Sequence, residues 1–152
     1  MVDTTEYVSI LEELVNNGKT VGIPIEGNSM SPFLITGRDY VLFQKPKRPL
    51  KVGDIVFFRR DTGKYVLHRI YSIKNGDYYM VGDGQTIVEG PIRTNQIFGI
   101  VTKIKRKGQW IDENDFWWKF FEKTWIRMRP FRPVVRNLYA LYYTIVKTHQ
   151  RG

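Results

Sequence analysis

Residues 55–70 read IVFFRRDTGKYVLHRI, a pattern typical of a β-hairpin. Two runs rich in β-branched and aromatic residues, 55–60 and 65–73, flank the turn signal Thr62-Gly63. Further runs of this kind lie at 21–25, 40–44, 78–81 and 98–105. A second turn signal is Asn75-Gly76. Since no helical pattern separates the runs, the sequence predicts a mainly β fold, a compact antiparallel sheet or barrel, rather than a parallel βαβ architecture.

The chain divides into an N-terminal helix, a β-rich domain and a tail, at residues 1–19, 20–111 and 112–152. The helix is amphipathic, with a capping box at Asp3–Glu6 and a stop signal at Gly18. In the tail we expect one helix over 112–123 and a second over about 134–148. The β-rich domain therefore has helical segments at both ends.

The positive charge is concentrated in the tail. The chain has 152 residues, with 24 Lys and Arg against 15 Asp and Glu, which gives a net charge of +9. Residues 1–115 carry +2 of this charge, whereas residues 116–152 carry +7 together with 10 of the 22 aromatic residues. A near-neutral body with a basic aromatic tail argues against a uniformly basic nucleic-acid-binding protein and for a specialised C-terminal surface.

The composition also excludes several kinds of chemistry. The chain has no cysteine, which excludes a disulfide scaffold, zinc–thiolate and iron–sulfur sites, and thiol catalysis. It contains no glycine-rich phosphate loop and no metal-ligand spacing, so no cofactor is expected. The N-terminus lacks the basic stretch of a signal peptide. The sequence also contains no run of about 18 apolar residues, the length needed to span a bilayer. We therefore expect a cytoplasmic protein, unless the tail holds it on a membrane surface.

A candidate nucleophile lies in the segment Glu26–Pro32, which reads EGNSMSP. Gly27 and Asn28 allow a tight turn directly before Ser29, and Pro32 fixes the exit of the chain from that turn. Ser29 would then lie on a constrained loop with its backbone N–H turned outward, as a nucleophile requires. An ordinary turn between two strands gives the same pattern.

His68 and Asp83 are the candidate partners of Ser29. His68 lies in the strand pattern of residues 65–73, on a face with apolar neighbours. Imidazole has an ordinary pKa near 6.5 and can accept the proton of a serine hydroxyl, while a carboxylate on its other ring nitrogen fixes the tautomer. Asp83, in Gly82-Asp83-Gly84, is the candidate carboxylate. Taken singly, a strand histidine is more often structural, and Asp83 is an ordinary turn residue.

Four motifs in this order resemble the signal peptidase I superfamily, which also contains the SOS-type self-cleaving repressors: Ser29-Met30-x-Pro32, Gly53-Asp54-Ile55-Val56, His68-Arg69-Ile70 and Gly82-Asp83. The resemblance covers about residues 20–105. It implies that Ser29 is the nucleophile and that His68 stands where most bacterial members have a general-base lysine, as in the endoplasmic-reticulum, archaeal and sporulation-type branch. It also implies that Asp83 supports the base and that Glu89 occupies a second acidic position of that branch.

The resemblance implies a serine endopeptidase that cleaves a peptide or leader from a precursor bound as an added strand. Gly27, Asn28 and Met30 would form the oxyanion and substrate loop around the Ser29 N–H. The family's Gly-Asp-Asn motif reads Gly-Asp-Gly here, and in place of the anchor of membrane-bound members stands only the helix predicted at the N-terminus. We therefore expect a soluble or peripheral relative acting on precursor peptides in the cytoplasm. The alternative is a catalytically inactive relative that binds peptides or a membrane-associated partner.

The tail segment Phe116–Arg129 mixes bulky aromatic side chains with cations. Such a segment can lie in a membrane interface, with its rings at headgroup depth and its cations toward anionic lipid. It can equally be a helix packed on the β domain with a solvated basic face. Nucleic-acid binding through stacking is a third interpretation, and no recognised binding motif accompanies the charge.

Overall fold

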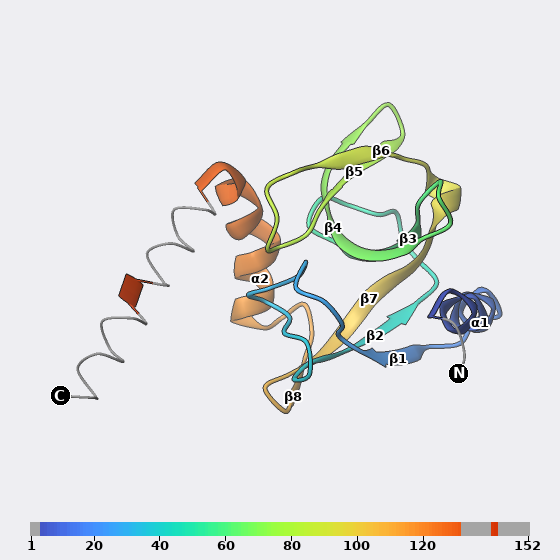
Figure 1. Cartoon of the computed structure of the whole chain (residues 1–152), viewed down its shortest axis with the longest axis horizontal. Helices are drawn as coiled ribbons and strands as arrows, with labels where there is room; N and C mark the ends of the chain where they lie inside the picture. Colours follow the sequence, from blue (N-terminus) through green and yellow to red (C-terminus); the bar gives the residue numbers. More distant parts are fainter. Residues whose placement is uncertain (1–3, 132–140, 143–152) are drawn as a thin grey trace.

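The computed structural model describes residues 4–131 and 141–142, and within them eight strands form one antiparallel sheet (Figure 1). The strands are β1 (Val21–Pro24), β2 (Tyr40–Gln44), β3 (Ile55–Arg59), β4 (Tyr65–Lys74), β5 (Asp77–Val81), β6 (Glu89–Ile92), β7 (Ile97–Arg106) and β8 (Gln109–Ile111). Their order is β1-β2-β7-β3-β4-β5-β6, and β8 pairs with β7. A 3-10 turn, η1 (Thr94–Gln96), precedes β7. The mainly β fold predicted from the sequence is confirmed.

Turn chemistry joins consecutive strands into hairpins. Asn75 and Gly76 between β4 and β5 have φ angles of 54° and 80°, the left-handed pair that a two-residue hairpin turn requires. Lys107 and Gly108 do the same between β7 and β8, with φ angles of 52° and 80°. The sequence did not predict β8 because the strand is only three residues long, nor β6 because Gly90-Pro91 lies inside it.

Helix α1 (Thr4–Asn16) is terminated by Gly18, two residues after its last helical residue. Gly18 adopts a φ of +87°, as the predicted stop signal requires. Asp3 of the predicted capping box lies outside the described residues. Helix α2 (Phe116–Lys123) begins four residues later than predicted, because the Asp115 side chain accepts hydrogen bonds from the N–H groups of Trp117 and Trp118 and caps the helix there.

A 3-10 segment, η2 (Trp125–Phe131), follows α2. The second tail helix, predicted over 134–148, lies outside the described residues apart from 141–142. Among the described helices, none is both long enough and apolar enough to cross a membrane.

The main apolar core is formed by buried residues of α1, of the sheet and of α2. Figure 1 places α1 and α2 on opposite sides of the curved sheet. Phe33, in the loop between β1 and β2, is fully buried and stacks on Phe121 of α2 with ring centroids 4.7 Å apart. Trp118 and Trp125 are buried with it. Helix α2 and the start of η2 thus pack on the β domain along this face.

The outer face of α2 has a different character. Phe116 is 71% exposed and Trp117 is 48% exposed, beside the exposed Lys119 and Lys123. Packing on the sheet therefore accounts for only part of the aromatic content of the tail.

Candidate active site

Ser29 lies in the loop between β1 and β2, on the constrained turn expected from the sequence. Gly27 adopts a φ of +75°, a left-handed conformation that favours glycine, with open space around it. After the turn, Ser31 N donates to Asn28 O (3.1 Å) and Leu34 N to the carbonyl of the buried Met30 (2.9 Å). The Ser29 side chain is left half-buried at the surface of this loop.

The Ser29 loop packs directly on the loop that follows β5. Gly84 N donates to the Ser29 carbonyl at 2.9 Å. A Cβ on Gly82 would fall on the same carbonyl oxygen, and a Cβ on Gly84 would lie 2.8 Å from Ser31 O. The two glycines of Gly82-Asp83-Gly84 are therefore required by close main-chain approach, and this approach fixes the position of Ser29.

Asp83 does not make the contact expected of it. Its carboxylate is fully buried, and both oxygens accept hydrogen bonds from Arg69, from Nε and from Nη2, each at 2.8 Å. Within the described residues it forms no hydrogen bond with His68. The reason is the alternation of β4: His68 and Arg69 are consecutive, so their side chains point to opposite faces. Asp83 lies on the Arg69 side, where the guanidinium binds both of its carboxylate oxygens.

Arg69 also ties a third loop to this pair. Its Nη1 donates to Gly53 O at 2.8 Å, and its guanidinium carbon lies 5.6 Å from the Phe33 ring centroid. Each of the three guanidinium nitrogens thus donates a hydrogen bond to the Gly53 or Asp83 loop, and the group also contacts Phe33 of the Ser29 loop. A buried ion pair is tolerated where hydrogen bonds of this kind offset the loss of hydration.

The carboxylate that faces His68 belongs to Glu89. His68 is 3% exposed, and its Nδ1 lies 3.3 Å from Glu89 Oε1. The two atoms are close enough for a salt bridge, but the Nδ1–H group and the carboxylate oxygen are poorly aligned. Nδ1 therefore completes no hydrogen bond within the described residues. Arg60 holds Glu89 through two hydrogen bonds, Nε to Oε2 at 2.9 Å and Nη2 to Oε1 at 2.7 Å.

Burial is the main influence on the titration of His68. It lowers the pKa of the imidazole to about 4, because the charged form loses its hydration; Glu89 opposes this shift and the Arg60 charge adds to it. The ring is therefore neutral at physiological pH, the form that can accept a proton.

Ser29 and His68 are linked through a short chain of contacts rather than directly. His68 precedes Arg69, Arg69 holds Asp83, and Gly84 bonds the Ser29 carbonyl. Within the described residues no hydrogen bond joins the Ser29 hydroxyl to the imidazole. No role was predicted for Arg60 or Arg69 from the sequence, although Arg69 stands inside the His68-Arg69-Ile70 motif.

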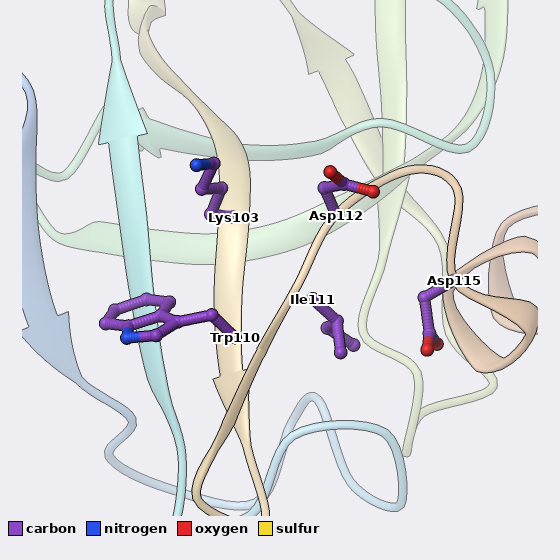
Figure 2. A pocket seen from close by; sticks show the side chains of 5 residues that line it. All are labelled: Lys103, Trp110, Ile111, Asp112 and Asp115. Carbon is purple, nitrogen blue, oxygen red and sulfur yellow. The ribbon is translucent and has the colours of Figure 1, made fainter.

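Two surface hollows lie away from Ser29 and His68. One, of about 270 Å³, lies between β7, β8 and the start of α2 and is lined by Lys103, Trp110, Ile111, Asp112 and Asp115 (Figure 2). The other, of about 290 Å³, is lined by polar residues that include Arg60. Neither contains Ser29 or His68. In the described part of the chain, no group of three or more His, Asp or Glu side chains could hold a metal ion.

The mainly β fold is consistent with a class of peptidase-like proteins, which the comparison with known families identifies. The sequence profile described as Peptidase S24-like matches residues 1–104. The chain belongs to this family, and the match includes Ser29, His68, Asp83 and Glu89. A comparison with curated proteins found no matching sequence.

Proposed function

We propose that the chain is a serine endopeptidase of the signal-peptidase type that uses Ser29 as nucleophile and His68 as general base, with Glu89 orienting the base. The observation that carries this proposal is the buried imidazole whose Nδ1 faces a carboxylate at 3.3 Å. A buried histidine with a strongly shifted pKa beside a carboxylate is typical of catalytic sites. The family supports a peptidase, and His68 in place of lysine is the feature that favours the branch named above.

The proposed reaction is hydrolysis through an acyl-enzyme. Ser29 Oγ attacks the carbonyl carbon of the scissile peptide bond while its proton passes to His68 Nε2, the ring nitrogen that does not face Glu89. This step requires the Ser29 hydroxyl to come within hydrogen-bond distance of Nε2 when the peptide binds. The C–N bond breaks as the imidazolium gives that proton to the leaving amine. Water then attacks the ester, its proton passes to His68, and His68 returns it to Ser29 Oγ as the C–O bond breaks. Through both steps, Glu89 stabilises the imidazolium.

The backbone around Ser29 suits the developing oxyanion. Within the described residues, the Ser29 N–H donates to no acceptor, so it is free to bind the negative oxygen of the tetrahedral intermediate. One such donor lowers the barrier by about 3–4 kcal/mol in serine hydrolases. Gly27 and Asn28 shape the turn that presents this N–H.

Precursor peptides are the proposed substrates, bound in an extended conformation. β1 and β6 are the two edge strands of the sheet path; β1 leads into the Ser29 loop, and β6 begins at Glu89. A peptide that pairs with β1 as an added strand is directed toward Ser29. We propose that the protein does this in the cytoplasm.

Cleavage of a proteome-derived peptide library, read by mass spectrometry, tests the proposal. Wild type and Ser31→Ala, a serine substitution two residues away in the same loop, should cut the same sites. Ser29→Ala and His68→Ala should cut none of them. Equal cleavage by all four proteins would contradict the assignment, and retention of peptides without cleavage by wild type would favour the inactive peptide-binding alternative.

We also propose that the outer face of α2 contacts an anionic membrane surface. Phe116 and Trp117 are exposed, and exposed cations lie next to them on the same helix. Flotation with phosphatidylglycerol vesicles at low salt tests this. Trp117→Ser should weaken binding, whereas Tyr7→Ser on α1, a residue of matched exposure at 47%, should not. Absence of wild-type binding would remove the membrane proposal without touching the peptidase proposal.

A further inference from the structure

The segment formed by α2 and η2 lies beyond residue 104, where the family match ends, yet it contacts the loops that build the candidate site. Figure 1 shows α2 beside the loops that follow β1 and β5. These contacts come from the inner face of the segment, from Phe121, Glu122 and Trp125.

Trp125 makes the contact of most consequence. Its indole is 8% exposed, and Nε1 donates to the main-chain carbonyl of Asp83 at 2.7 Å in a buried hydrogen bond. Asp83 lies between Gly82 and Gly84, the residues against which the Ser29 main chain rests. The Arg69 guanidinium fixes the Asp83 side chain, and the Trp125 indole fixes its backbone.

Phe121 and Glu122 act on the other two loops. Phe121 stacks on Phe33, four residues after Ser29 in the same loop. Glu122 packs so closely on Gly53 that a Cβ there would meet both its side chain and, at 3.0 Å, its carbonyl oxygen. Gly53 O is the third acceptor of Arg69. All three loops around Arg69 are therefore held from outside by one short segment.

We propose that α2 and η2 form a clamp that positions the Ser29 loop, with Trp125 as its central positioning residue. This inference rests on the proposed function for its effect on turnover, but its effect on loop order does not depend on catalysis. The indole N–H donates one hydrogen bond that a phenyl ring cannot replace. Replacing Trp125 by phenylalanine therefore leaves the buried Asp83 carbonyl without this donor.

Hydrogen–deuterium exchange of the full chain tests the clamp without an activity assay. The reporter is the Gly84 amide, which donates to Ser29 O. Trp125→Phe keeps an aromatic ring but loses the N–H, and we expect Gly84 exchange to accelerate about tenfold. Tyr65→Phe is the matched control, because it removes a single hydrogen bond, to Glu12 of α1, on a different side of the fold; it should leave Gly84 exchange unchanged.

Turnover of a peptide cut by wild type gives the second readout. Trp125→Phe should lower kcat about tenfold with KM within twofold, at a temperature where the variant is fully folded, whereas Tyr65→Phe should keep both constants. Unchanged Gly84 exchange in Trp125→Phe overturns the clamp whether or not the protein cleaves peptides. Faster exchange in a protein that cleaves nothing supports the clamp and refutes the peptidase.

Discussion

Two neighbouring residues of β4, His68 and Arg69, each face a carboxylate, and the two pairs are built differently. Arg69 and Asp83 are fully buried and joined by two hydrogen bonds of 2.8 Å, with Gly53 O as a further acceptor. His68 and Glu89 are 3.3 Å apart and poorly aligned, and the Glu89 side chain is 28% exposed and shared with Arg60.

The difference matches the roles that we propose for the two pairs, structural for Arg69 and chemical for His68. In the Arg69 pair each guanidinium nitrogen donates a hydrogen bond and each Asp83 carboxylate oxygen accepts one, so the pair holds the surrounding loops in place. In the His68 pair the low pKa keeps the imidazole neutral, and Nδ1, which faces Glu89, completes no hydrogen bond within the described residues. On the proposed function, one strand thus carries a structural ion pair on one face and the general base on the other.

Breaking the Arg69 pair should have the largest effect on stability. Arg69→Met leaves the Asp83 carboxylate buried without its cation, and we expect a loss of about 3–5 kcal/mol in the free energy of unfolding, measured by guanidinium denaturation. Arg48→Met is the control, because Arg48 also pairs bidentately with a buried aspartate, Asp54, but is itself 45% exposed at its side chain. Equal losses in the two variants would contradict the distinction.

The His68 pair should instead give the protein a pH-dependent stability. The folded-state pKa of about 4 lies below the unfolded value near 6.5, so the unfolded chain binds more protons between these pH values. Stability should therefore fall as the pH drops from 6.5 to 4, by about 3 kcal/mol from this group. Urea denaturation of wild type and His68→Gln across this range measures it; the same slope in both proteins would show that His68 titrates normally.

Strand patterns and turn signals were sufficient to predict most of this architecture from the sequence. Alternating apolar runs bounded by Gly, Asn and Thr gave six of the strands, and the Gly27-Asn28 turn located Ser29. The edge strand β6 was missed because Gly90-Pro91 is unfavourable in a strand, and with it the position of Glu89 relative to His68.

Pairing of the side chains could not be predicted in the same way. Alternation along β4 puts His68 and Arg69 on opposite faces, but only the course of the chain after β5 determines which carboxylate reaches which face. For the same reason, the spacing of aromatics in the tail could not separate Trp125, which is buried, from Phe116, which is exposed.

Removing the shared partner Arg60 should have the smallest effect on stability. Arg60→Met leaves Glu89 partly exposed to water, so the loss should stay below about 1 kcal/mol. The pKa of His68 should rise, because the Arg60 charge lowers it. An NMR titration of the His68 ring measures this shift, with Arg93→Met as the control for an exposed arginine. A pKa unchanged or lowered in Arg60→Met would contradict the electrostatic description of the site.

The proposed division between a structural ion pair and a general base is tested most directly by Glu89→Gln, which keeps the shape of the side chain and removes its charge. Turnover of a peptide cut by wild type and the free energy of unfolding should be measured on the same preparation. The account predicts a kcat at least about 100-fold below wild type, since the imidazolium loses its stabilising carboxylate, with unfolding changed by less than about 1 kcal/mol. Wild-type turnover in Glu89→Gln would contradict it.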